Sequence, residues 1–319
     1  MTTSRITASG ETLQSPDTAA YMRDLQCWPL SERRRIVGVF TDIDDTLTTE
    51  GAITADALAG LHALRDAGLV VIPITGRPVG WSETFAMTWP VRAVVAENGA
   101  VALLPLQDAA AKVSEQAPEE SSEAKYANEK SRSAISDGRL QLSKIYQQTA
   151  CERAENFARM QQVAARVLRE IPGTSISRDS PGRETDIAID HSEFAQLAPS
   201  TIDRVVALLR GEGMHATVSS IHINGWFGEH DKLSGARWIL RTLLGRDLDA
   251  EIDRWVYVGD STNDQTMFGA FPHSVGVANI ARFVPQLAVL PRYVTQGERG
   301  AGFAQVTQAL LQARQRAAG

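Results

Sequence analysis

The chain has 319 residues, of which 43% are hydrophobic and 22% are charged, and its formal net charge is −6 at pH 7. This length accommodates one large domain or two ordinary domains, and the acidic balance argues against a nucleic-acid binder, whose surface would carry a basic face. Two cysteines cannot form a disulfide framework, and no apolar run is long enough for a signal segment or a membrane helix, so we expect a cytoplasmic protein without a membrane partner.

The first part of the chain alternates between strand and helix patterns. Residues 1–34 are expected to form a partly flexible N-terminal extension. The run 36–43 is apolar and closes on acidic residues, which is typical of a strand buried on both faces of a parallel sheet. A helix is expected after Thr54, its N-cap, and the runs 69–74 and 93–96 predict two further strands. This alternation predicts βαβ units and a parallel sheet.

A different pattern occupies residues 101–222. The segment 107–144 is polar and poor in aromatic residues, which predicts a solvated or partly disordered insertion. A long helix follows, in which Thr149 and Glu152 have the spacing of a capping box. Its expected apolar stripe is Phe157, Met160, Ala164, Val167 and Ile171. The remaining elements are a helix near 201–210 and strands at 186–190 and 216–223.

The parallel-sheet pattern resumes after this insertion. Asp231 can cap a helix that ends at Gly245, and the run 255–259 predicts another buried strand. The last expected elements are short strands near 274–278 and 292–294 and a helix from about residue 302. The expected domains are a Rossmann-like α/β core, residues 35–100 and 223–319, and an inserted α+β domain, residues 101–222.

Acidic residues follow two of the predicted strands, at the edge of an open α/β sheet where ligands bind. Asp42 and Asp44 are two positions apart, so an extended chain aims both carboxylates at one centre, where one can attack and the other can transfer a proton. A solvated acidic loop explains this pair equally well in isolation. Asp260 and Asp264 follow the run 255–259, and oxygen ligands from separate strand ends are what Mg²⁺ takes.

Two further features supply what phosphate chemistry needs. Thr75 can donate to a phosphoryl oxygen, and Gly76 allows a tight turn beside it. Lys232, in the first turn of a predicted helix, carries a compact positive charge suited to a phosphate. Each alone is explained as a turn or a surface residue. A carboxylate and a phosphate are both negative, and two like charges ~4 Å apart repel by ~4 kcal/mol at an effective dielectric constant of ~20. A divalent ion and a lysine offset that repulsion. The carboxylates, the lysine and the expected metal ion therefore explain one another.

This ordered set of motifs resembles the haloacid dehalogenase-like superfamily. The matching residues are Asp42-x-Asp44-x-Thr46, Thr75, Lys232, Gly259-Asp260 and Asn263-Asp264. The insertion between Thr75 and Lys232 is similar to the C2-type cap domain of subfamily IIB, which includes Cof-type sugar phosphatases, sucrose-phosphate phosphatase and mannosyl-3-phosphoglycerate phosphatase. Residues 97–100 (ENGA) are similar to a stretch common in that group. The family most often has glycine at the position of Asp45, which here adds a negative charge at the site mouth.

The resemblance implies a magnesium-dependent phosphatase that works through an aspartyl-phosphate. Asp42 would be the nucleophile, and Asp44 would protonate the leaving group and then activate water. The residues implied to bind the phosphoryl group are Thr75, Gly76, Lys232 and Asn263. The implied Mg²⁺ ligands are Asp42, the backbone carbonyl of Asp44 and Asp260, with Asp264 in or next to the shell.

Substrate recognition is expected to come from the cap and from its edges. The candidate residues are Arg77, Glu97, Asn98, Arg183, Asp186, His222 and Asn224. There are simpler explanations for four of them: His222 and Asn224 can belong to an ordinary linker, and Arg183 and Asp186 can be ordinary surface charges. The expected substrate is a small phosphorylated metabolite, namely a sugar phosphate or a glycosyl-glycerate phosphate. Two alternatives stay open, a sugar phosphomutase and a non-catalytic regulatory protein that keeps the fold, and the sequence leaves the oligomeric state undetermined.

Overall fold

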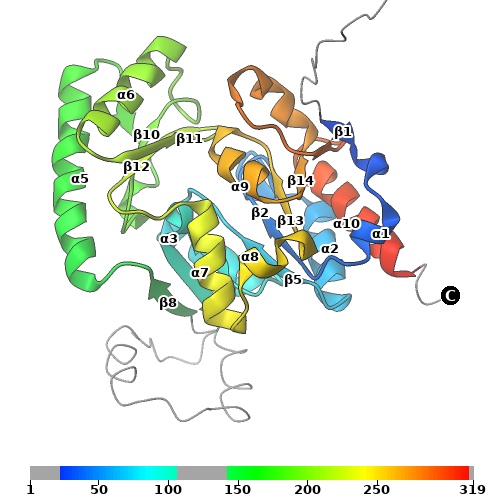
Figure 1. Ribbon diagram of the computed structural model, residues 1–319. Coiled ribbons are helices and arrows are strands. Elements are labelled where there is room, and N and C mark those ends of the chain that lie inside the picture. The colour runs from blue at the N-terminus through cyan, green and yellow to red at the C-terminus, as the bar shows by residue number, and fades with distance from the viewer. Residues whose placement is uncertain (1–21, 106–141, 316–319) are drawn as a thin grey trace, which may run out of the picture.

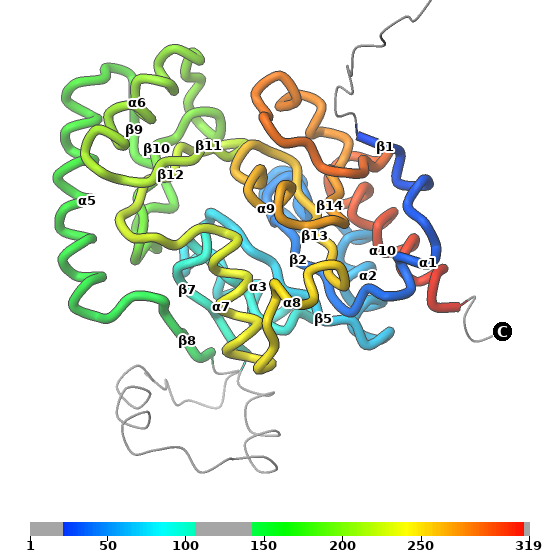
Figure 2. Tube along the Cα trace, viewed as in Figure 1, coloured from blue at the N-terminus to red at the C-terminus, as the bar shows by residue number. Residues whose placement is uncertain are grey.

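The computed structural model describes residues 22–105 and 142–315 (Figures 1 and 2). Its centre is a six-stranded sheet in which all neighbouring strands are parallel. In sheet order the strands are β1 (Arg23–Asp24), β15 (Tyr293–Val294), β14 (His273–Gly276), β13 (Trp255–Gly259), β2 (Gly38–Thr41) and β5 (Val70–Pro73). The sheet confirms the predicted α/β class with a Rossmann-like core. No helix in the two described ranges combines the length and apolar character that crossing a membrane requires.

Helices cover both faces of the parallel sheet, each over its own hydrophobic core. Consecutive strand residues point to opposite faces, so Val39 lies in one core and Phe40 in the other. The helices that pack on the Val39 side are α2 (Ala55–Asp66), α3 (Val79–Thr88) and α10 (Arg299–Gln315). The helices on the Phe40 side are α7 (Lys232–Leu244), α8 (Leu248–Glu251) and α9 (Gln265–Ala270). A short helix, α1 (Leu30–Arg33), packs against α10.

A three-stranded antiparallel sheet flanks this core. Its strands are β6 (Val94–Ala96), β7 (Val101–Pro105) and β8 (Leu142–Tyr146). The strand predicted at 93–96 is therefore present, but it pairs antiparallel with β7 and meets the parallel sheet through a single bridge between Ile74 and Val95. Residues 142–144 of the polar segment lie in β8, and the rest of that segment, like residues 1–21, is outside the described residues.

The cap is a four-stranded antiparallel sheet covered by two helices, at the left of Figure 1. In sheet order its strands are β11 (His215–Val218), β12 (His222–Trp226), β10 (Ile187–Asp190) and β9 (Ser175–Ile176). The helices are α5 (Ala150–Glu170) and α6 (Pro199–Gly211). Figure 2 shows the chain entering this unit after β8 and leaving it after β12. The expected boundary at 222/223 falls inside β12, and the domain boundaries stay a prediction.

Two local predictions in the cap were wrong. The run 216–223 is two strands rather than one, because the chain reverses at Ser219–Ile221 and pairs with itself, with the Ser219 N–H donating to the His222 carbonyl at 2.8 Å. Phe157 is 37% exposed, so the buried stripe of α5 is Met160, Val163, Ala164 and Val167.

The predicted helix starts are confirmed. Thr54 caps α2 by accepting from the Ala57 N–H, and Thr149 and Glu152 form the capping box of α5. Asp231 caps α7, which ends at Gly245 in the left-handed conformation. The remaining short elements are β3 (Thr48–Thr49), β4 (Ala52–Ile53), and the 3₁₀ turns η1 (Leu25–Cys27), η2 (Glu97–Gly99), η4 (Ser180–Gly182), η5 (Ile252–Arg254), η6 (Thr262–Asp264), η7 (Ala278–Arg282) and η8 (Val284–Gln286).

The start of α7 packs directly against η2. A Cβ added to Gly235 would lie 2.6 Å from the Gly99 Cα, and a Cβ added to Gly99 would lie 2.2 Å from the Asp231 carbonyl oxygen. Gly99 also has a φ of +109°, which L side chains rarely adopt. These two glycines therefore permit the close backbone approach that brings Lys232, at the start of α7, to the sheet edge.

Gly235→Ala is expected to destabilise the protein by about 1–3 kcal/mol, because the new methyl group overlaps backbone atoms that cannot move independently. The measurement is the urea midpoint of unfolding. Gly269→Ala is the matched control, since its Cβ would meet only Val289 at 3.6 Å and alanine favours a helix. Equal midpoints for the two variants would contradict the prediction.

Candidate active site

The carboxyl ends of β2, β5 and β13 meet at one edge of the parallel sheet, because β2 lies between the other two. Asp42 directly follows β2, and Asp260 directly follows β13. The Ile74 N–H donates to the Thr41 carbonyl at 2.8 Å, which places Thr75 at the same edge. The topology thus assembles residues that are far apart in the sequence.

Lys232 lies buried between two carboxylates. Its Nζ donates to Asp42 Oδ1 at 2.6 Å and to Asp264 Oδ1 at 2.7 Å. Although burial acts to lower the pKa of Lys232, the two carboxylates raise it above its ordinary value, so the lysine stays charged. Burial raises the pKa of Asp42 to about 8 and outweighs Lys232, which acts to lower it. A second cation beside Asp42 would lower that pKa again.

Three buried carboxylates are close enough to share a metal ion. Asp42, Asp260 and Asp264 each offer an oxygen within 4.8 Å of the others. Both carboxylate oxygens of Asp264 already have hydrogen-bond donors, because besides Lys232 they accept from the Tyr257 hydroxyl and from the N–H groups of Asp260 and Ser261. Asp260 Oδ1, in contrast, is buried without a hydrogen-bond partner. Buried polar atoms normally have a partner, and carboxylate oxygens are what Mg²⁺ prefers, so Asp260 Oδ1 is a candidate metal ligand.

Two arginines offset the negative charge that Asp45 adds at the mouth of the site. This residue has a φ of 55°, in the left-handed region that favours glycine. Its carboxylate lies 2.6 Å from Arg282 Nη2 and 3.0 Å from Arg299 Nε. Arg282 and Asn279 also donate to Asp260 Oδ2, at 3.2 and 3.0 Å. Asp260 is therefore oriented so that only Oδ1 remains for a metal ion.

Asp44 is held by the arginine of the Thr75-Gly76-Arg77 turn. Arg77 Nε donates to both Asp44 oxygens at 3.0 Å. Burial raises the pKa of Asp44, and Arg77 acts to lower it. The Arg77 N–H donates to the Thr75 hydroxyl at 3.0 Å, so the hydroxyl proton can be donated to another acceptor.

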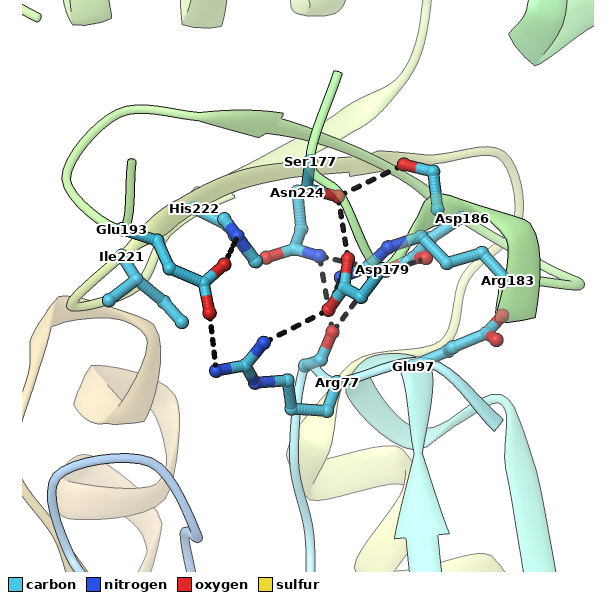
Figure 3. Close-up of polar contacts among 12 residues, drawn as sticks. Arg77, Glu97, Ser177, Asp179, Arg183, Asp186, Glu193, Ile221, His222 and Asn224 are labelled. Carbon is cyan, nitrogen blue, oxygen red and sulfur yellow. Dashed lines mark hydrogen bonds and ion pairs between the residues drawn. The ribbon is translucent and has the colours of Figure 1, made fainter. Parts of the chain in front are cut away.

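The predicted substrate-binding residues fall into two groups. Arg77, His222 and Asn224 line a small pocket together with Asp42 and Asp44. The other four are buried and contact only other parts of the protein; they are Glu97, Asn98, Arg183 and Asp186. Figure 3 labels all of these except Asn98.

Glu97 joins the core to the cap. Its side chain accepts from the Val79 N–H in the core at 3.0 Å, and from the N–H groups of Glu184 and Thr185 in the cap. Burial raises the pKa of Glu97 to about 7. With no exposed surface and protein donors on both oxygens, Glu97 faces no ligand in this conformation.

The Gly76 carbonyl is a second point of attachment for the cap. It accepts from Arg183 Nη1 at 2.9 Å and from Asn224 Nδ2 at 3.2 Å. Both donors also reach Asp186, as does Asn98 Nδ2 at 3.4 Å. These side chains fix the cap over the Thr75–Arg77 turn.

The pocket beside Asp42 and Asp44 encloses about 10 Å³, which is room for about one water molecule. Asn263 completes its core side. A cavity of about 830 Å³ adjoins it and shares Ser220 and Asn263 with it. The expected phosphorylated metabolite does not fit in the small pocket, so its binding would require movement of the cap or of side chains there.

Sequence reasoning missed several residues at this edge. Tyr257, Asn279 and Arg282 contact the carboxylates from the core, and Asp179 and Glu193 pair with Arg77 from the cap. Asn279 and Arg282 follow β14, so the rule that ligands bind at carboxyl ends of strands could have indicated them. Nothing in the local sequence pattern marks the two cap residues.

The family model described as haloacid dehalogenase-like hydrolase matches residues 39–305. No curated protein sequence matches the chain. The fold is similar to the sucrose-phosphatase of Synechocystis sp. PCC6803, solved with sucrose and phosphate (13% identity, TM-score 0.55, 87% of this chain and 98% of that chain). It is also similar to the C-terminal domain of the C. albicans trehalose-6-phosphate phosphatase (13%, 0.56, 93% and 99%) and to the subclass IIB sugar phosphatase BT4131 (14%, 0.52, 85% and 97%). These findings confirm the resemblance expected from the motifs.

Proposed function

The chain belongs to the haloacid dehalogenase-like hydrolases, and from this we propose that it is a magnesium-dependent phosphatase that acts on a sugar phosphate. The observation that carries the proposal is the position of Lys232, which bridges Asp42 and Asp264 next to the unpartnered Oδ1 of Asp260. A phosphate-binding cation, a nucleophile and a metal-ligating oxygen thus lie together at one sheet edge.

In the proposed reaction, an Asp42 carboxylate oxygen attacks phosphorus, and the bond from phosphorus to the ester oxygen breaks. Asp44 gives its proton to the departing alcohol. It then takes a proton from the water that attacks the aspartyl-phosphate, which releases inorganic phosphate and restores Asp42. Lys232, Thr75 and Asn263 hold the phosphoryl oxygens during both steps.

We assign the Mg²⁺ ligands to the Asp42 and Asp260 carboxylates and the Asp44 carbonyl, with Asp264 beside them. The fit rests on the buried, unpartnered Asp260 Oδ1 and on the three carboxylates, Asp42, Asp260 and Asp264, whose oxygens lie within 4.8 Å of one another. When bound, Mg²⁺ would neutralise the charge of the carboxylates and of the transferred phosphoryl group.

The sugar part of the substrate is proposed to lie in the cavity of about 830 Å³. Its lining offers uncharged hydrogen-bonding residues such as Ser192, Ser220 and Asn263, together with the charged Asp203 and Arg210. Several proteins of similar fold are named for sugar-phosphate substrates, which supports this class at the level of fold only.

The test is phosphate release from a panel of mono- and disaccharide phosphates, with Mg²⁺ and with EDTA. We expect release from at least one ester, and only with Mg²⁺. Release in EDTA would exclude the metal-dependent mechanism. Isomerisation of a hexose 1-phosphate without free phosphate would instead establish a phosphomutase.

Mg²⁺ is also expected to raise the unfolding temperature, because an ion that binds only the folded state stabilises it, by about 2.7 kcal/mol at a hundredfold excess over its dissociation constant. Asp260→Asn should abolish most of this shift. Asp249→Asn, an exposed acid paired with Arg237, is the control and should keep it. An unchanged shift in Asp260→Asn would place the ion elsewhere.

A further inference from the structure

Arg77 connects the core to the cap through three carboxylates, and Figure 3 shows its cap side. Its Nε donates to both oxygens of Asp44 at 3.0 Å. Its Nη1 donates to Asp179 at 3.1 Å and its Nη2 to Glu193 at 3.1 Å. Asp44 belongs to the core, whereas Asp179 and Glu193 belong to the cap. Every nitrogen of the guanidinium therefore has a carboxylate partner from the protein.

Both cap carboxylates are held in place by the cap itself. The Glu193 N–H donates to Asp190 at 3.0 Å, and its Oε2 lies 2.8 Å from His222 Nε2. Asp179 accepts from the Ser177 hydroxyl at 2.6 Å. Each cap residue thus meets Arg77 with one oxygen while a neighbour in the cap fixes its direction.

The shape of the guanidinium transmits this direction to Asp44. The group is planar, so holding Nη1 and Nη2 also sets the direction of Nε. The Trp81 ring, whose centroid is 4.7 Å from Arg77 Cζ, adds a contact to the guanidinium, and the side chain is only 7% exposed. If the cap left the core, Arg77 would lose two of its three acidic partners, and only Asp44 and the Trp81 ring would remain to orient its guanidinium.

We propose that Glu193 and Asp179 are positioning residues that hold Arg77 against Asp44, so that the orientation of Asp44 depends on the docking of the cap. The inference rests on the acid/base role proposed for Asp44. In this proposal Arg77 joins the docked cap to the core and is not a ligand of the substrate. Proton donation to the leaving group is thereby tied to the same movement that excludes water from the site.

The test compares two small esters of similar size, phenyl phosphate and p-nitrophenyl phosphate, in the presence of Mg²⁺. Phenolate is the poorer leaving group, so its departure depends more strongly on a well-placed acid. In Glu193→Gln and in Asp179→Asn we expect kcat/KM to fall at least about tenfold for phenyl phosphate and less than about threefold for p-nitrophenyl phosphate. A role in stability alone would lower both values equally.

Two further variants sharpen this test. In an Arg77→Met background, Glu193→Gln should have no additional effect, because the residue through which it acts is gone. Glu212→Gln is the matched control, since it removes a partly exposed cap carboxylate that pairs with Arg166, away from Arg77. Equal losses for the two esters, or additive losses in the double variant, would overturn the inference.

A second measurement does not depend on catalysis. The Arg77 side-chain N–H signals, identified by their loss in Arg77→Lys, should be resolved in the nitrogen-correlated NMR spectrum of the wild type and should broaden or vanish in Glu193→Gln. Unchanged signals would overturn the inference even in an active enzyme. If the wild type hydrolyses neither these esters nor any sugar phosphate, the proposed function is wrong. The Arg77 signals would still show whether Glu193 holds Arg77 in place.

Discussion

Asp42→Asn is expected to abolish phosphate release, with a loss of at least ~10³-fold in kcat, because an amide cannot form the aspartyl-phosphate. The amide has the same shape as the carboxylate and can still contact Lys232, so the fold should be retained. The measurement is phosphate release from the best ester of the panel at saturating Mg²⁺, with circular dichroism to establish folding.

The control for this variant is Asp253→Asn, which alters an exposed acid paired with Arg35 and should leave the rate unchanged. A folded Asp42→Asn protein with wild-type phosphate release would remove Asp42 as the nucleophile. The family assignment would stand in that case, but the mechanism proposed for this chain would not.

Lys232→Met is expected to lower the free energy of unfolding in EDTA by about 3–5 kcal/mol, because it leaves Asp42 and Asp264 buried without their shared cation. The variant should also lose activity, since the phosphoryl group loses a cation. The measurement is urea unfolding followed by tryptophan fluorescence, with the metal-free condition kept for both proteins.

Lys144→Met provides a matched comparison. Lys144 also bridges two carboxylates, Glu83 at 2.7 Å and Glu184 at 3.1 Å, but its side chain is 29% exposed. Ion pairs that reach solvent contribute about 0–1 kcal/mol, so this variant should lose at most that amount. Comparable losses in the two variants would show that burial of the Lys232 pair does not have the effect proposed here.

Much of the fold follows from signals that are local in the sequence. Thr54, Thr149 and Asp231 mark helix starts because their side chains satisfy N–H groups only a few residues away. The run 255–259 is a strand buried on both faces, as its continuous apolar character predicts. The stretch 93–96 shows the limit of such signals, since strand character does not reveal which neighbour a strand pairs with.

The candidate site divides in the same way. The sequence by itself predicts that Asp42 and Asp260 lie at one edge, because parallel strands bring their carboxyl ends together, and it predicts Lys232 beside them from the resemblance of the motifs. Only the tertiary structure decided that Asp260 keeps one oxygen unpartnered and that Arg77 meets Glu193, 116 positions away in the chain. Such contacts depend on side-chain directions and on how the cap is seated, and neither leaves a periodic trace in the sequence.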